Sequence, residues 1–148
     1  MKRQSIRVRA AAAFGVAGKI LVHRVENRCD GKVWYIPPGG GMEYGETSLE
    51  ALHREIKEEL SWEIKDVSLI GCFESFHRIN GIEEHEISFT YAAAINDVSP
   101  RLEEPVEVIE MNGKKKVFNW VELNSMLSPT TVLYPAGLLA VVLDQYNL

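Results

Sequence analysis

Apolar residues along the chain follow two periods, and each period predicts a different kind of element. Alternating apolar and polar residues, or short β-branched runs between turn residues, predict strands. Spacings of three and four predict an amphipathic helix. The expected strands cover residues 5–14, 19–25, 33–36, 64–79, 86–95, 105–110 and 114–121, and the expected helices cover residues 48–60 and 136–145.

The first expected helix has a defined start and one apolar side. Thr47 can cap it, with Glu50 three residues later as the partner in a capping box. The residues expected to pack on the core recur at spacings of three and four: Leu49, Leu52, Ile56 and Leu60.

The order of elements predicts the fold class. Turn signals at residues 80–81 and 112–113, both Asn-Gly, predict two hairpins, and a break is expected near Gly71. Pro135 is expected in the first turn of the second helix, where a proline is well tolerated, whereas residues 130–134 are ambiguous. Three strands, a helix, two hairpins and a helix predict an α+β fold, with helices packed on a mixed sheet.

Length and composition restrict the class of protein. The 148 residues are expected to form one domain, residues 1–148. A net charge of -5 argues against binding to a nucleic acid polymer. Two cysteines make no disulfide framework, which favours a reducing, cytoplasmic location. The N-terminal segment is basic and then apolar, but its alternation favours a strand over a signal peptide, and no apolar run is long enough for a membrane span.

Acidic residues concentrate on the first expected helix. Glu55, Glu58 and Glu59 stand at i, i+3 and i+4, so their side chains share one face. Like charges at this spacing destabilise a helix, and two of them lie in its last turn, where the helix dipole disfavours anions. A cation is therefore expected beside this face, and oxygen-only ligands suit Mg²⁺ or Mn²⁺.

A glycine-rich segment precedes the helix. Gly39, Gly40 and Gly41 allow the backbone to approach a ligand closely, and Gly45 does the same at the turn into the helix. Unpaired N–H groups at the start of the helix can be used by Glu46 or by a phosphate. Arg54 can hold one carboxylate in a bidentate pair.

These residues form the pattern Gly40-x5-Glu46-x7-Arg54-Glu55-Ile56-x-Glu58-Glu59, which resembles the signature of the Nudix hydrolase family, the MutT-like pyrophosphohydrolases. The resemblance implies an α/β/α sandwich. It also implies a hydrolase that uses Mg²⁺ or Mn²⁺ to cleave the pyrophosphate linkage of a nucleoside di- or triphosphate derivative. The expected partner is thus a small nucleotide, and a homodimer is left open.

The resemblance also assigns roles by position. Glu58 and Glu59 would ligate the metal, and Glu55 would be a ligand or the base that activates water. Arg54 would orient Glu55. Gly39 or Gly40 would offer a backbone carbonyl to the metal. Glu46 would be structural, and Glu43 has no fixed role.

Two positions depart from the family pattern, and several assignments stay open. Ser61 and Trp62 stand where the family has a glycine and an aliphatic residue. The two differences affect how the chain leaves the first expected helix. They leave every carboxylate of the signature in place. The resemblance also implies a further metal ligand or base in a loop that lies beyond the signature in the sequence. The candidates for substrate or metal contacts outside the signature are Arg24, Asp97, Glu103 and Glu104.

Two other hypotheses compete with that of a hydrolase. The alternative is a Nudix-like nucleotide sensor or regulator without turnover. The third hypothesis is that the acidic helix has a purely structural role. The histidines at 23, 53, 77 and 85 share no spacing that suggests a site. His85 and Glu86 are expected to have a surface role at the start of a strand.

Overall fold

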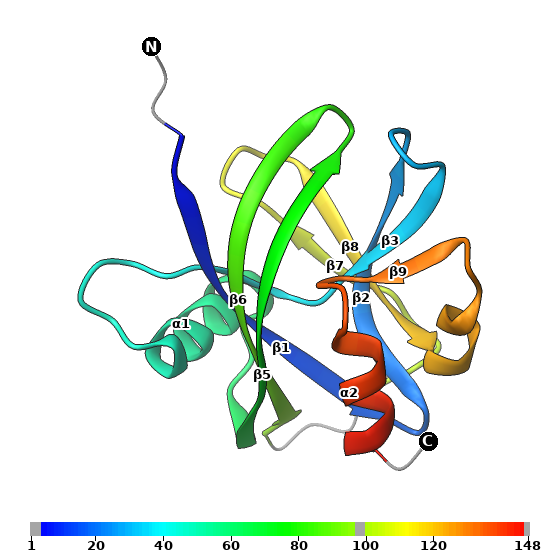
Figure 1. Ribbon diagram of the computed structural model, residues 1–148. Helices are drawn as coiled ribbons and strands as arrows, with labels where there is room; N and C mark the ends of the chain where they lie inside the picture. Colours follow the sequence, from blue (N-terminus) through cyan, green and yellow to red (C-terminus); the bar gives the residue numbers. More distant parts are fainter. Residues whose placement is uncertain (1–3, 97–99, 147–148) are drawn as a thin grey trace.

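The computed structural model describes residues 4–96 and 100–146, which fold into nine strands, two α-helices and one 3-10 turn (Figure 1). The elements are β1 (Ile6–Val16), β2 (Lys19–Asn27), β3 (Lys32–Ile36), β4 (Gly39–Gly41), α1 (Ser48–Leu60), β5 (Ile64–Ile79), β6 (Ile82–Ile95), β7 (Val106–Ile109), β8 (Lys115–Glu122), η1 (Leu123–Leu127), β9 (Thr131–Leu133) and α2 (Leu138–Gln145).

The strands form one mixed sheet with the order β5-β6-β1-β2-β3-β9. β1 runs parallel to β6 and β3 runs parallel to β9, whereas the other pairings are antiparallel. β4 adds to β1, and the β7–β8 hairpin adds to β2. β1 is therefore the strand that joins the two halves of the sheet.

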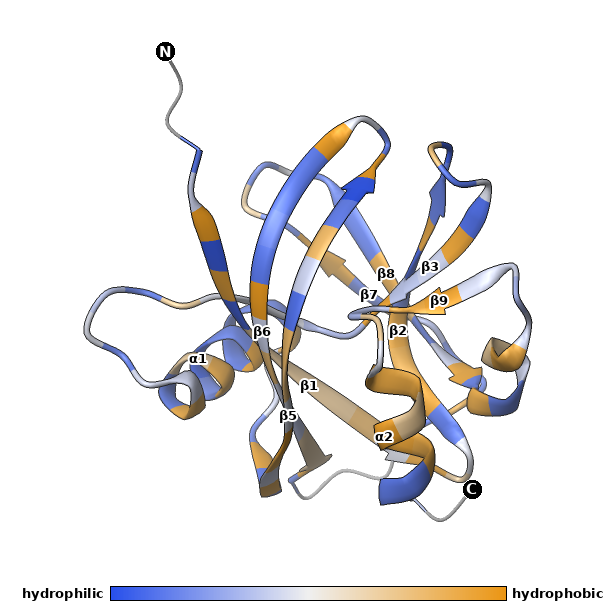
Figure 2. Ribbon diagram, viewed as in Figure 1, coloured by the Kyte–Doolittle hydropathy of each residue, from blue (hydrophilic) through white to orange (hydrophobic). Residues whose placement is uncertain are grey.

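The two helices cover opposite faces of β1 and β2. On one face, Ala12 and Phe14 of β1 share a core cluster with Leu52 and Ile56 of α1. On the other face, Ala13 shares a second cluster with residues of α2. Because both faces are buried, β1 carries a continuous apolar run from residue 10 to residue 14 instead of an alternating one. Figure 2 shows hydrophobic residues along β1 and over α2, and a hydrophilic side on α1. The predicted α/β/α sandwich is confirmed.

Helix α1 begins where the sequence predicts. The Thr47 side chain accepts a hydrogen bond from the Glu50 amide at 3.1 Å, and both halves of the capping box are present. Leu52 and Ile56 are fully buried. The prediction for Leu49 is wrong, because its side chain is 43% exposed. Ala51 is fully buried instead, so the first turn presents a small residue to the core.

The end of α1 accommodates both departures from the signature. Ser61 takes the left-handed conformation that a glycine would favour, with φ 58° and ψ 31°, and its amide donates to the Lys57 carbonyl at 2.9 Å. Trp62 packs edge-on against Phe14, with ring centroids 5.6 Å apart. The helix exit is thus completed by core packing.

Most strand boundaries differ from the predicted ones by one or two residues, and three further differences have an identifiable structural cause. Residues 39–41 were expected as a loop but form β4, because glycines can pair closely with β1. β6 begins at residue 82, since the tight turn lets pairing start at once. α2 begins at Leu138, because Gly137 has φ 96° and cannot belong to a right-handed helix; Pro135 therefore precedes the helix. β5 is continuous, with register shifts near Gly71.

No helix in the described part of the chain is both long and apolar enough to cross a membrane.

Candidate active site

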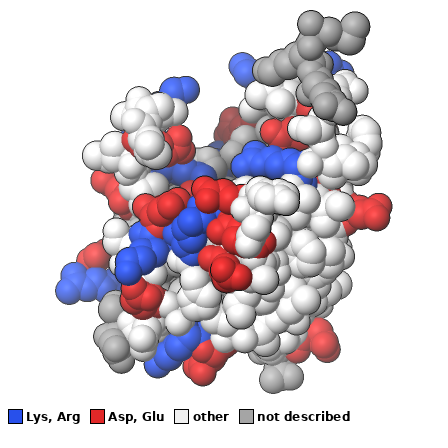
Figure 3. All heavy atoms as spheres, turned by 90° about the vertical axis from the view of Figure 1, so that its left-hand side faces the viewer, with Lys and Arg blue, Asp and Glu red and all other residues white. Residues whose placement is uncertain are grey.

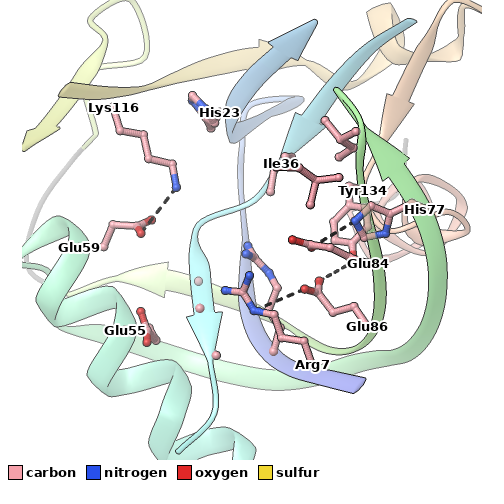
Figure 4. A pocket seen from close by; sticks show the side chains of 16 residues that line it. Arg7, His23, Ile36, Glu55, Glu59, His77, Glu84, Glu86, Lys116 and Tyr134 are labelled. Carbon is pink, nitrogen blue, oxygen red and sulfur yellow. Dashed lines mark hydrogen bonds and ion pairs between the residues drawn. The ribbon is translucent and has the colours of Figure 1, made fainter. Parts of the chain in front are cut away.

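A cavity of about 460 Å³ lies beside β4, between the acidic side of α1 and the β5–β6 hairpin. Figure 4 shows carboxylates of α1 at one end and a group of polar side chains from other strands at the opposite end. In the wider view of Figure 3, acidic and basic side chains lie together on the face of the molecule that carries α1. The charged residues that line the cavity are Arg7, Arg9, Glu55, Glu59, Glu84, Glu86 and Lys116.

Arg54 connects the glycine segment to the carboxylates of α1. Its guanidinium binds Glu46 through two nitrogens and donates to Glu55 Oε1 at 2.8 Å and to Glu58 Oε2 at 3.3 Å. It also donates to the Gly41 carbonyl at 3.0 Å. The bidentate pair is thus with Glu46, whose pKa it lowers by hydrogen bonding, and a single bond holds Glu55.

Glu55 fits against the backbone of β4. A Cβ placed on Gly40 would come within 2.8 Å of Glu55 Oε1 and still closer to Oε2. Such a contact is shorter than a carbon and an oxygen tolerate, so only a glycine lets the Glu55 carboxylate lie here. Gly40 therefore has a steric role that the signature alone does not reveal.

The register of β4 decides which glycine carbonyl is free. Met42 donates to the Val8 carbonyl and Ala12 donates to the Pro38 carbonyl, each at 2.9 Å. Every second residue pair in an antiparallel ladder is hydrogen-bonded, so Gly40, between these pairs, turns its backbone groups toward β1. The carbonyls of Gly39 and Gly41 point the other way, and that of Gly41 already accepts from Arg54.

Glu59 lines the cavity beside Lys116. Its side chain is 18% exposed, and Oε2 lies 3.8 Å from Lys116 Nζ. Oε1 is buried and has no hydrogen-bond partner among the described residues. Burial raises the pKa of Glu59, although Lys116 and Arg9 act in the opposite direction. A buried oxygen without a partner is costly, by about 1–3 kcal/mol.

Glu58 takes a different position. Its side chain is 62% exposed, and it contacts Arg54 without lining the cavity. Within the described ranges, no three His, Cys, Asp or Glu side chains converge as a ready-made metal site. Arg54 lies between Glu55 and Glu58, so it screens their mutual repulsion. The donor set nonetheless fits a hard divalent cation, because Glu59 Oε1 and the Gly39 carbonyl are oxygen ligands.

Two cations lie near these carboxylates. Arg9 lines the cavity, and one nitrogen donates to the Pro37 carbonyl, whereas Nε is buried without a partner in the part of the chain that the structure describes. Burial lowers the pKa of Arg9, and the nearby Glu86 raises it. Lys116 reaches in from β8. Both can bind an anionic ligand in the cavity.

The comparisons with known proteins agree with this geometry. The NUDIX domain profile matches residues 6–140. The chain belongs to the Nudix family. No curated protein gave a significant match.

Solved Nudix structures resemble the chain over nearly its whole length. A MutT NUDIX hydrolase from Burkholderia pseudomallei is 26% identical, with a TM-score of 0.63, over 94% of this chain and 98% of that one. A NUDIX hydrolase from Nitrosomonas europaea is 18% identical, with a TM-score of 0.62, over 97% and 89% of the two chains, and shows the fold alone. The profile match and the similarity to the Burkholderia structure support a Nudix hydrolase.

Three of the four candidates outside the Nudix signature, Arg24, Glu103 and Glu104, do not line the cavity. Arg24 pairs with Glu26 at 2.9 Å. Glu103 is 90% exposed and pairs with Lys19 at 3.3 Å, and Glu104 pairs with Arg101 at 3.5 Å. Asp97 lies outside the described residues.

The surface role expected for Glu86 is wrong. It is 3% exposed and lines the cavity with His77, Glu84 and Tyr134. β6 is covered from the point where it meets β1, so Glu86 faces inward. The one sequence signal was the series Glu86, Ser88 and Thr90, which places polar side chains on one face of a strand.

Proposed function

We propose that this Nudix chain hydrolyses the pyrophosphate linkage of a nucleoside di- or triphosphate derivative. The observation that carries the proposal is Glu59, a half-buried residue that lines a cavity of about 460 Å³ and whose buried Oε1 lacks a partner among the described residues. Such an oxygen gains a partner when it becomes the ligand of a divalent cation. The cavity volume falls in the range of small-molecule sites.

The metal would be Mg²⁺ or Mn²⁺, and its proposed ligands are Glu55, Glu58, Glu59 and a glycine carbonyl. The register of β4 favours Gly39 over Gly40 as the source of that carbonyl. When bound, the metal would polarise a phosphoryl oxygen and offset charge that develops on it. Glu58 would join this set by turning its exposed side chain inward.

The chain's own residues would position the reactants. Arg9 and Lys116 line the cavity and would bind the phosphates, with the unpartnered Arg9 Nε as a ready donor. Glu55, held at one oxygen by Arg54, would act either as a ligand or as the acceptor of a proton from the attacking water. Arg54 would act through Glu55 and Glu46, and Gly45 and Glu46 would hold the loop.

The test is a panel of nucleotide derivatives incubated with Mg²⁺ or Mn²⁺ at mildly alkaline pH, with products separated by ion-exchange chromatography. The expected products are a nucleoside monophosphate and phosphate, pyrophosphate or a phosphorylated group. Glu59→Gln should lower turnover at least a hundredfold, whereas the exposed Glu63→Gln, outside the cavity, should match the wild type. Equal activity of all three proteins would refute the role of Glu59.

A non-catalytic sensor remains the competing proposal, because Arg54 already bonds Glu55 and Glu58. Titration calorimetry would separate the two: a sensor binds nucleotide with metal but releases no product. The net charge of -5 supports a small nucleotide over a nucleic acid polymer as the ligand. A cytoplasmic site of action is part of the same proposal.

A further inference from the structure

Glu86 is a buried carboxylate that the proposed hydrolysis does not use. It lies on β6 opposite Arg7 of β1 and lines the cavity at the end away from α1. Figure 4 shows it on the far side of β4 from Glu55 and Glu59. The residue is 3% exposed.

Its two oxygens have unequal surroundings. Oε1 accepts a hydrogen bond from the Tyr134 hydroxyl. Oε2 lies 3.7 Å from Arg7 Nε, beyond hydrogen-bond distance. A carboxylate can accept about four hydrogen bonds, so Glu86 retains acceptor capacity inside the cavity. A structural ion pair in a protein interior is normally satisfied by close hydrogen bonds.

The surroundings suit a flat ring with a polar edge. Ile36, Ile79 and Ile82 line the same cavity and provide an apolar surface. Arg7 offers a donor beside the acceptor of Glu86. An acceptor and a donor side by side match the edge of a heterocyclic base, which presents N–H and carbonyl or ring-nitrogen groups in turn.

We propose that Glu86 is a specificity-determining residue that accepts a hydrogen bond from an exocyclic amino group on the base of the substrate. An amino group projects beyond the ring, so it is the part of a base that reaches a recessed acceptor. Arg7 would donate to the neighbouring acceptor of the same edge. This inference rests on the proposed hydrolysis of a nucleotide and adds the class of base that the site selects.

The experiment compares pairs of substrates in which one member carries an exocyclic amino group and the other lacks it. GTP is paired with ITP, and CTP is paired with UTP. In the second pair, the donor and acceptor positions along the edge of the base are also exchanged. The wild type should favour the amino-bearing member of at least one pair by about 10- to 100-fold in kcat/KM, mainly through KM. In Glu86→Gln the ratio of the two kcat/KM values should fall to about threefold or less, because the glutamine amide has one acceptor oxygen and no charge. The outward-lying Glu83→Gln, on the same strand but outside the cavity, should keep the wild-type ratio.

A second variant guards against misfolding. Glu86→Asp keeps the charge beside Arg7 but withdraws the carboxylate by about one bond length, and it should also reduce the ratio. Melting temperatures of both variants establish that they are folded. The proposal is overturned if both variants lower kcat/KM for every substrate by the same factor, which marks a structural role, or if the wild type does not discriminate within either pair.

Failure of the proposed hydrolysis would look different. In that case no nucleotide would be cleaved by the wild type with either metal. Calorimetry with both pairs, GTP with ITP and CTP with UTP, in the presence of Mg²⁺ would then still measure whether Glu86 selects the amino-bearing base. Equal affinities within both pairs in the wild type would overturn the role of Glu86 independently of catalysis.

Discussion

Gly40→Ala is the sharpest test of how β4 positions the carboxylates of α1. The new methyl group would lie 2.8 Å from Glu55 Oε1 and closer to Oε2. An ordinary van der Waals contact begins near 3.4 Å, so the Glu55 carboxylate must retreat by at least about 0.6 Å, and by about 1 Å at its nearer oxygen. The hydrogen bond from Arg54 to Glu55, now 2.8 Å, lengthens or breaks as a result.

A misplacement of about 1 Å at a catalytic group can lower the rate about a hundredfold, which corresponds to about 2.7 kcal/mol of transition-state stabilisation. The loss should appear in kcat with Mg²⁺ and as weaker binding of Mn²⁺ by calorimetry. Stability should change little, because the obstructing atoms are the end of a flexible side chain. A thermal melt should therefore place Gly40→Ala within a few degrees of the wild type.

Gly41→Ala is the matched control. The nearest atoms to a Cβ there are Arg7 Nε and the Val8 carbonyl oxygen, each 3.9 Å away, so the methyl group fits. A double variant with Glu55→Asp tests the cause, since the shorter side chain makes room and the Gly40→Ala penalty should shrink in that background. The reasoning is refuted if Gly40→Ala and Gly41→Ala have the same activity, or if the Gly40→Ala penalty is undiminished in the Glu55→Asp background.

Three further predictions address the cation, the helix end and pH. Saturating Mg²⁺ or Mn²⁺, at a hundred times its Kd, should raise the Tm by about 5–10 °C, and scanning calorimetry should show no rise in Glu59→Gln. Ser61→Gly should stabilise the protein by up to about 1 kcal/mol, because the residue is left-handed at φ 58°; an unchanged urea midpoint would contradict this. The pKa of Glu46 is lowered from 4.5 by Arg54, so its stabilisation exists above pH 4.5 and is lost as pH falls through the folded pKa. Urea denaturation between pH 3 and 6 should show the wild type and Glu46→Gln converging at the acid end.

Features set by near neighbours in the chain were predictable from the sequence. The Thr47 cap, the left-handed Ser61 and the shared face of Glu55 and Glu59 all depend on spacings within one or two helical turns. The continuous apolar run of β1 indicated burial on both faces. Such features follow from periodicity and local backbone preferences, which a sequence displays directly.

Features set by pairing between strands distant in the sequence were not predictable, unlike the two hairpins at the Asn-Gly turns. Glycines 39–41 lack side chains that could signal a strand, and only pairing with β1 makes them one. Glu86 comes to the cavity because β6 lies parallel to β1, a contact between residues about 80 positions apart in the sequence. Tyr134 reaches Glu86 from beyond β9. These contacts depend on topology, and the local pattern around Glu86 is that of any half-exposed strand.

Two charged groups with unpartnered atoms in one cavity support a ligand site over a structural one. Among the described residues, four side-chain polar atoms are buried without partners. Two of them are Ser88 Oγ and Thr90 Oγ1, and the other two, Arg9 Nε and Glu59 Oε1, belong to side chains that line the cavity. Each such atom costs about 1–3 kcal/mol, in a fold whose total stability is typically 5–15 kcal/mol. An apolar residue at either position would avoid that cost. A cation that binds Glu59 and an anion that binds Arg9 would satisfy both atoms at once, and a metal-bound diphosphate presents both charges in one ligand.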